Sequence, residues 1–419
     1  MRAHEMAIPM KQKYLSTGAK VLLAIAGIGA LAYTYRLVFG LGAATNLDNQ
    51  YPWGIWISID VATGVALAAG GFTTAALVHI FHREKFHAIV RPALLTAMLG
   101  YTFVVIGLLA DLGRYYNVWH PMLPSMWQGN SVLFEVGMCV MIYLTVLYIE
   151  FVPIVVERFK GRVKLPGPVA TFNRVVEFLI SLADRTLVRF ISVFVIAGVV
   201  LSCLHQSSLG TLMLIAPTKM HPLWYTPISP LLFLLSAIAV GFPMVIMESL
   251  LAARSFKIEP ERDILSSIAA YIPVLLGIYL GVKILDLTLR DAWHYLFQGS
   301  LQSTMYIIEI SLGVIIPIIM LSSARIRRSM NGLFIAATLV VLGVALNRIN
   351  VFIVAYKPLY PVKSYFPSIF EMAVTIGLIS MLVLVYRAIV MIFPVIQAHP
   401  QESSPSLHDE SVVANVGAR

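Results

Sequence analysis

The chain has 419 residues, of which 59% are hydrophobic and 12% are charged, and its formal net charge is +9. Soluble domains carry roughly 25% charged residues, so this composition excludes an ordinary soluble domain and indicates a polytopic membrane protein. The chain has only two cysteines and no CxxC motif, which excludes a cysteine-based structural zinc site, an iron–sulfur cluster or a c-type haem held by this chain alone. The positive charge is better explained by membrane topology than by nucleic-acid binding.

Ten apolar segments are long enough to cross a bilayer as helices, which takes about 20 residues. They lie near residues 21–41, 55–78, 92–112, 131–155, 187–208, 228–252, 265–286, 302–323, 331–351 and 368–393. The polar stretch before the first segment is too long for a signal peptide, so we expect that segment to be retained. We therefore expect an all-α integral membrane domain over residues 1–395 and a disordered cytoplasmic tail over residues 396–419.

Lysines and arginines gather in alternate connections between the spans. The rich stretches are 2–20, 83–91, 158–189, 254–262 and 325–328, whereas the opposite side receives few, with Arg36, Lys283 and Arg348 counted among its loops. The positive-inside rule then places both termini in the cytoplasm. The basic connection 157–186 is expected to hold a short amphipathic helix on the anionic leaflet.

A weak internal repeat relates the two halves of the chain. The sequence Trp127–Gly129 before the fourth span matches Phe297–Gly299 before the eighth, and Glu135 then corresponds to Glu309. Asp111 and Arg114 after the third span are likewise echoed by Asp286 and Arg290 after the seventh. The pattern predicts two four-helix bundles, formed by helices 2–5 and 6–9, with helices 1 and 10 flanking them.

Ionisable residues inside spans usually face a bundle interior and mark a functional route, because a charge in hydrocarbon is costly. Glu135 in "SVLFE", Tyr101, His205 and Glu248 are the candidates for chemistry, whereas Glu150 and Glu371 lie near span ends and are interpreted as structural. Because the spans alternate in direction, we expect Asp111, Arg114, Glu135 and His205 to converge near the outer surface. Tyr101 would lie further inward, and Glu248 near the inner face.

A quinone needs hydrogen-bond partners for two carbonyls, a group that exchanges protons and an apolar slot for its tail. Histidine, tyrosine and a carboxylate supply the polar part, and Trp53 or Trp119 can stack on the ring. A b-type haem would need two axial histidines at one depth on facing helices. Only His205 lies clearly within a span on the outer half, so the sequence favours a haem-free quinone site.

Several motifs resemble a known family. The stretches "GLGAATNLDNQYPWGIWISID", "VRPALLTAMLGYTF", "DLGRYYN", "NSVLFE", "HQSSLGTLM", "KMHPLW" and "MVIMES" are similar to those of NrfD / polysulfide-reductase-type membrane subunits. The resemblance runs from about residue 37 to residue 387 and is closest to the membrane subunits of hydrogenase-2-type complexes. Similar subunits occur in sulfite-reduction-associated redox complexes and in multihaem cytochrome complexes.

The resemblance implies a haem-free subunit that binds menaquinone or ubiquinone near the outer surface of a bacterial or archaeal cytoplasmic membrane. It also implies a periplasmic, ferredoxin-like iron–sulfur partner joined to a catalytic or multihaem subunit. Tyr101, Glu135, His205 and Glu248 match polar intramembrane positions of the family and are the expected catalytic residues. The expected quinone-contacting residues are Trp53, Asp60, Asp111, Arg114, Tyr115 and His205, and no metal ligand is expected.

Two other functions remain open on the sequence alone. A purely structural membrane anchor would bind no quinone and would tolerate substitution of Glu135 and His205. An ion or proton transporter fits the parallel repeat and the buried carboxylates, although helices broken at matching positions of the two halves are not evident.

Overall fold

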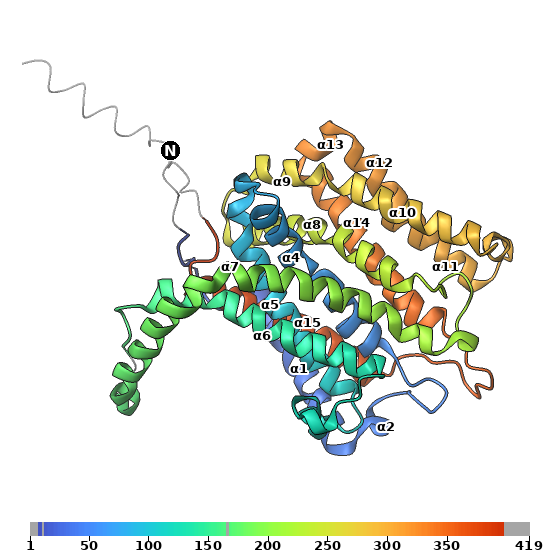
Figure 1. Ribbon diagram of the computed structural model, residues 1–419, viewed down its shortest axis with the longest axis horizontal. Helices are drawn as coiled ribbons and strands as arrows, with labels where there is room; N and C mark the ends of the chain where they lie inside the picture. The colour runs from blue at the N-terminus through green and yellow to red at the C-terminus, as the bar shows by residue number, and fades with distance from the viewer. Residues whose placement is uncertain (1–6, 11, 165–166, 398–419) are drawn as a thin grey trace, which may run out of the picture.

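The computed structural model describes residues 7–10, 12–164 and 167–397 (Figure 1). Within these ranges the elements are helices, apart from a single β-bridge between Met220 and Tyr356. Ten of the helical segments are long and apolar enough to cross a membrane, and each overlaps one predicted span. The predicted all-α polytopic fold is therefore confirmed. Most of the predicted tail, from residue 398 onward, lies outside the described residues.

The helices follow one another along the chain in a regular up-and-down order. Their bounds are α1 (Thr17–Phe39), α2 (Leu41–Ala44), α3 (Gly64–Leu67), α4 (Ala69–Ala75), α5 (Val90–Asp111), α6 (Val132–Phe159), α7 (Asn173–Thr211), α8 (Ser229–Phe256), α9 (Arg262–Ala269), α10 (Ile272–Leu289), α11 (Leu301–Ile310), α12 (Ile316–Ser322), α13 (Ala324–Arg328), α14 (Met330–Ile349) and α15 (Ile369–Ile392). The second span runs from Trp56 to Ile80 and contains α3 and α4, while α9 with α10 and α11 with α12 form the seventh and eighth spans.

The spans pack as two four-helix bundles and one flanking pair. In the first bundle α4, α5, α6 and α7 contact one another in a ring, and in the second bundle α8, α10, α12 and α14 do the same. The bundles meet where α8 packs against α4 and α7. Helices α1 and α15 lie together and pack against α5. This arrangement is the one that the internal repeat predicts.

The contact between the bundles depends on two glycines at related positions of the repeat. A Cβ added to Gly70 of α4 would lie 3.2 Å from the carbonyl oxygen of Gly241, and one added to Gly241 of α8 would lie 2.3 Å from Oγ1 of Thr73. Small residues let helices approach closely in a membrane, where van der Waals packing supplies much of the association energy. Each half therefore contributes a glycine at a related position to the contact between the bundles.

Four stretches of the spans are π-helical, at Trp56–Thr63, Ala76–Ile80, Ser311–Ile315 and Asn350–Val354. A π-helical turn widens the helix and frees backbone groups from regular i to i−4 bonding, and such turns are frequent at functional sites. Asp60 lies in the first of these stretches and Asn350 begins the last. Both residues take part in the polar clusters described below.

The loops divide the molecule into two chemically different ends. We call the end formed by residues 40–55, 112–131, 216–228, 290–300 and 355–368 the aromatic end, and the end formed by residues 81–83, 160–172, 257–261 and 323–329 the basic end. In Figure 1 the basic end lies along the left and top of the molecule and the aromatic end along the right and bottom. Helix α7 is 39 residues long, and its first third extends past the body at the basic end.

Candidate functional sites in the membrane interior

A buried hydrogen bond joins α5 to α7 inside the first bundle. Nδ1 of His205 lies 3.0 Å from the hydroxyl oxygen of Tyr101, and both side chains are fully buried. The ring of Tyr143 from α6 packs edge-on against Tyr101, with centroids 4.6 Å apart. The structure thus brings together two of the four residues that the sequence predicts to carry chemistry.

The second ring nitrogen of His205 makes no hydrogen bond within the described part of the chain. Nε2 is buried and has no hydrogen-bond partner, and neither does Oε1 of Gln206, whose amide nitrogen donates to the carbonyl oxygen of Val65. Most buried polar atoms in proteins are paired. When Tyr101 donates to Nδ1, Nε2 carries the ring proton and donates; when Nδ1 donates to Tyr101, Nε2 accepts. The cluster can therefore bind either a carbonyl or a hydroxyl group.

Glu135 lies in the first turn of α6, at the aromatic end, and is exposed on the surface of this chain. Helix α6 begins at Val132, after Ser131, whose hydroxyl accepts a hydrogen bond from the backbone nitrogen of Phe134. The helix dipole stabilises a carboxylate in this first turn. Cys139, one turn further along α6, is a neighbour of both Glu135 and Ser208 of α7. Glu135 therefore lies on the surface of α6, one turn from the Cys139–Ser208 contact, and outside the His205 cluster.

Asp111 at the end of α5 lies close to the guanidinium of Arg36 from α1. Arg36 is 1% exposed, and its guanidinium donates to the carbonyl oxygens of Ala110 and Leu112. The same guanidinium lies 5.3 Å from the ring centroid of Tyr115. Of the predicted quinone-contacting residues, Asp111 and Tyr115 therefore gather around an arginine that the sequence had assigned to a loop.

The structure places Arg114 outside the predicted site. It is exposed, and among the described residues it forms no hydrogen bond or ion pair with Asp111, Glu135 or His205. The predicted convergence of these four residues is wrong, because the chain turns outward after Leu112 and directs Arg114 to the surface. Its counterpart in the repeat, Arg290, does pair with the preceding aspartate, as described below.

Asp60 lies beside α5, one turn further inward than Asp111. Its Oδ2 accepts a hydrogen bond of 2.6 Å from Oγ1 of Thr375 in α15, and the side chain is 9% exposed. A Cβ added to Gly107 would lie 2.7 Å from the Cβ of Asp60, so only glycine fits at that point of α5. Oδ1 of Asp111 is buried without a partner. Two predicted carboxylates thus lie near one another with few hydrogen-bond donors.

The remaining predicted residues lie apart from the His205 cluster. Trp53 packs edge-on against Phe352 of the second bundle, with ring centroids 6.1 Å apart. Glu248 lies in the part of α8 that approaches the basic end, near Thr96 and Tyr386, and its two carboxylate oxygens are buried without a hydrogen-bond partner. Glu371 lies in the first turn of α15 and forms a capping box with Ser368. This agrees with the interpretation of Glu371 as a structural residue.

The second bundle holds a buried ion pair. Nζ of Lys283 in α10 lies 2.6 Å from Oε1 of Glu309 in α11, and the two side chains are 5% and 2% exposed. Glu309 also accepts hydrogen bonds from Trp224, Asn347 and Asn350, so its carboxylate is surrounded by donors. The pair links four segments of the second bundle through one carboxylate.

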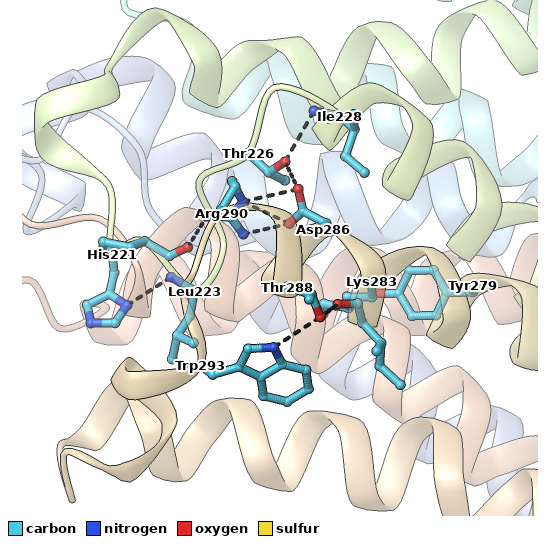
Figure 2. Close-up of polar contacts among 12 residues, drawn as sticks. His221, Leu223, Thr226, Ile228, Tyr279, Lys283, Asp286, Thr288, Arg290 and Trp293 are labelled. Carbon is cyan, nitrogen blue, oxygen red and sulfur yellow. Dashed lines mark hydrogen bonds and ion pairs between the residues drawn. The ribbon is translucent and has the colours of Figure 1, made fainter.

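Towards the aromatic end the same bundle has a second ion pair. Figure 2 shows the guanidinium of Arg290 facing the carboxylate of Asp286, with Nη2 to Oδ2 at 2.6 Å, while the hydroxyl of Thr226 donates to Oδ1 of Asp286. Nη1 of Arg290 donates to the carbonyl oxygen of Pro222, which ties the loop before α8 to α10. A small cavity lined in part by Lys283, Asp286 and Thr226 lies between the two pairs.

The residues that the sequence failed to select are Arg36, Lys283 and Arg348. All three were counted as loop residues, yet they are between 1% and 4% exposed and lie within helices. Lys283 stands inside the apolar run "LGVKILDL", where a lysine is costly without a partner, so the signal was present in the sequence. The sequence does not identify the partner of each charged residue, because the partners come from other helices.

Comparison with known proteins agrees with this architecture. The family model "Polysulphide reductase, NrfD" matches residues 43–359. The chain is 33% identical over 391 residues to the probable Ni/Fe-hydrogenase 2 b-type cytochrome subunit of Escherichia coli (strain K12), covering 93% of this chain and 94% of the relative. It is 26% identical to the menaquinone reductase integral membrane subunit of Nitratidesulfovibrio vulgaris, covering 90% of each chain.

A further relative is a selenate reductase subunit of Mesobacillus selenatarsenatis, which is 24% identical, with the match covering 90% of this chain and 93% of the relative. These relatives are named as parts of different redox enzymes, so the likeness extends over a shared membrane scaffold rather than over one enzyme. The family match covers most of the chain and contains the Tyr101–His205 pair. The chain belongs to the NrfD (polysulphide reductase) family of integral membrane redox subunits.

Proposed function

We propose that this chain is the quinone-reactive membrane subunit of a multisubunit redox complex. It passes electrons between an iron–sulfur partner and menaquinone or ubiquinone. The observation that carries the proposal is the buried Tyr101–His205 hydrogen bond, which leaves Nε2 of His205 without a partner inside the first bundle. A binding site for an apolar molecule with two oxygens needs such a group.

The histidine suits both redox forms of the substrate. Nε2 donates to a quinone carbonyl in one tautomer and accepts from a quinol hydroxyl in the other, while the Tyr101 hydroxyl takes the complementary role at Nδ1. Two-electron reduction of a quinone also takes up two protons. We assign their entry to Glu135 at the aromatic end, with Glu248 as the proposed group near the basic end. Asp60, Asp111 and Tyr115, next to Arg36, are proposed to border the quinone site.

The aromatic end is the proposed docking surface for the partner. Its loop 112–131 exposes Tyr116 (62%), Trp119 (47%), Met122 (68%) and Trp127 (50%), a composition typical of interface hot spots. The proposed partner is a ferredoxin-like iron–sulfur subunit with its catalytic or multihaem enzyme. Docking there would bring a cluster of the partner to the side from which Glu135 and His205 are approached.

The basic end is proposed to face the cytoplasm of a bacterium or archaeon, with the aromatic end in the periplasm or its equivalent and both termini cytoplasmic. The proposal follows from the positive-inside rule, because the loops of the basic end carry most of the lysines and arginines. Crosslinks from the partner to the basic end would contradict both the orientation and the docking side.

The chain is proposed to be free of haem, although the name of the Escherichia coli relative describes that protein as a b-type cytochrome. His205 is held by Tyr101 through one nitrogen, and a b-type haem would need a second axial histidine at the same depth on a facing helix. An optical spectrum of the purified chain tests this directly. A stoichiometric b-haem band would refute it.

The function is tested by purifying the chain with its native partners from membranes and extracting the bound quinone. Co-purification of an iron–sulfur subunit and recovery of quinone are expected. Turnover with a soluble quinone should be lost in His205→Gln, while the partner's reaction with an artificial dye should persist. A complex without quinone whose turnover tolerates this substitution would instead support a purely structural anchor.

A further inference from the structure

The connection between α6 and the membrane-spanning part of α7 has a strongly basic composition. Residues 158–189 contain seven basic side chains and two acidic ones. The structure uses both acidic side chains internally: Asp184 pairs with Lys160, and Oε1 of Glu177 accepts a hydrogen bond of 2.7 Å from the backbone nitrogen of Gly161. These contacts fasten the start of α7 to the end of α6 and leave a net positive surface.

The start of α7 also has an exposed apolar stripe. Val175, Phe178, Leu179 and Leu182 follow the i, i+3, i+4, i+7 spacing of one helix face and are 52%, 65%, 54% and 45% exposed. Further along the same helix the stripe continues with exposed apolar side chains in the span, at Phe190, Val193, Ile196 and Val200. The stripe is therefore continuous with a surface that faces lipid.

Two arginines lie along one edge of this stripe. Arg174 and Arg185 are eleven residues apart, close to three full helical turns, so they lie almost on one line of the helix. Both are exposed. Arginine at the border of an apolar face keeps its charge in water while its stem covers apolar surface. The acidic residues Glu177 and Asp184 lie on the far side of this line, towards α6.

The length and direction of α7 indicate that the membrane surface covers the apolar stripe. Its 39 residues span about 58 Å, roughly twice the thickness of a bilayer core of about 30 Å. Figure 1 shows the green start of α7, at the lower left, turning across the direction of the spans instead of continuing along it. A segment placed in this way at the end of a span lies in the plane of the membrane surface.

We propose that residues 172–189 form a binding surface for anionic phospholipids, with the apolar stripe in the acyl boundary and Arg174 and Arg185 on the headgroup phosphates. Interfacial helices with a basic border bind in this way, because basic residues near an anionic surface are attracted to the headgroups. Arg162 and Lys164 in the preceding loop add to the same field. The inference depends only on the membrane-spanning fold and not on the quinone chemistry.

The test uses the full chain in nanodiscs of phosphatidylcholine, with or without phosphatidylglycerol, and measures trypsin cleavage after Arg162, Lys164, Arg174 and Arg185. Cleavage is expected to be at least tenfold slower when phosphatidylglycerol is present. Cleavage in the segment 325–328 serves as the internal comparison, because this basic stretch at the same end lacks an exposed apolar stripe, and it should slow far less than cleavage at 162–185. Equal rates in the two lipids at 162–185 would overturn the proposal.

Paired variants separate headgroup binding from burial in the fold. Arg174→Gln with Arg185→Gln removes two of the trypsin sites, so cleavage is then followed after Arg162 and Lys164, where it should return in phosphatidylglycerol discs to within twofold of the neutral-lipid rate. Arg325→Gln with Arg328→Gln should leave the protection at Arg162 and Lys164 intact. Protection that survives in the first pair contradicts the proposal. Protection that appears only after a partner subunit is added would identify a protein-docking surface and would overturn it as well.

A second measurement reports on the apolar stripe. Phe178→Trp places a fluorophore on the stripe, and lipids with brominated acyl chains should quench its emission relative to that of the parent chain. The added tryptophan should be quenched in phosphatidylglycerol discs and lose this extra quenching when Arg174 and Arg185 are both replaced by glutamine. Absence of extra quenching in the anionic discs would show that the stripe does not enter the membrane.

Discussion

The hydroxyl of Tyr101 lies 3.0 Å from Nδ1 of His205, and this bond joins α5 to α7 at a depth where neither side chain is exposed. The atom on the other side of the ring, Nε2, is free. A hydrogen bond of this kind sets which ring nitrogen carries the proton. The phenol therefore decides whether His205 presents a donor or an acceptor to a bound molecule.

Replacing Tyr101 by phenylalanine removes that control and leaves Nδ1 buried without a partner. An unpaired buried group costs about 1–3 kcal/mol, so quinone-linked turnover should fall by roughly 5-fold to 160-fold. Dye-linked activity of the partner should be unchanged. The control is Tyr148→Phe, because the Tyr148 hydroxyl bonds Thr102 on an exposed surface. Equal turnover in the two variants would remove Tyr101 from the site.

Glu135→Gln keeps the shape and hydrogen bonding of the side chain and removes its ability to titrate. Because Glu135 is proposed to admit protons to the quinone site, we expect the variant to assemble with its partner and lose most quinone-linked turnover while dye activity persists. Steady-state assays between pH 6 and pH 8 measure this. Turnover near that of the wild type over the whole range would show that the carboxylate is structural.

His221, in the loop before α8, gives the fold a dependence on pH. Burial, reinforced by the nearby charge of Lys357, lowers the pKa of His221 to about 4. The neutral ring accepts a hydrogen bond through Nδ1 from the backbone nitrogen of Leu223. Since the folded pKa lies below the unfolded value of about 6.5, this stability is present above pH 6.5 and is lost as the pH falls towards 4.

His221→Asn should therefore make the melting temperature less sensitive to pH. The amide oxygen can accept the same hydrogen bond from Leu223 but does not titrate. We expect the drop in melting temperature of the purified chain between pH 7 and pH 4.5 to be smaller in this variant than in the wild type. His294→Asn is the control, because His294 is an exposed histidine in another loop of the same end. Identical pH profiles for His221→Asn and the wild type would contradict the prediction.

Breaking the Lys283–Glu309 pair from one side should be more harmful than removing it entirely. Glu309→Leu leaves a buried lysine without a counter-charge, which costs about 3–5 kcal/mol. The double variant Lys283→Met with Glu309→Leu replaces both charges by apolar groups and should recover much of the lost stability. Melting temperature and yield of the monodisperse chain measure this. A double variant no more stable than the single one would show that the other bonds of Glu309 dominate.

Much of the architecture is predictable from the sequence. Apolar length fixes the number of spans, the distribution of basic residues distinguishes the two ends, and a spacing of about 170 residues between similar motifs reveals two bundles. The glycines that allow the bundles to touch, Gly70 and Gly241, obey the same spacing. Each of these signals is local or periodic along the chain, so it can be recognised in the sequence without knowledge of the tertiary contacts.

The sites are predictable only in part. Tyr101 and His205 stand out as polar residues within apolar runs, and the structure brings them together. Glu135 and Arg114 were expected beside them, but one lies at the start of its helix and the other on the surface. A hydropathy pattern gives the depth of a residue to within a turn and says little about the direction in which its side chain points.

The sequence by itself determined that this is a ten-span, two-bundle membrane protein with polar groups inside it. Only the tertiary structure decided the partners: Arg36 with Asp111, Thr375 with Asp60, and Lys283 with Glu309. The physical reason is that burying a charge in a membrane is costly whatever its sequence neighbours are. A charged residue within an apolar run therefore indicates by itself that it needs a partner. The partner itself comes from another helix, and its identity depends on how the helices pack.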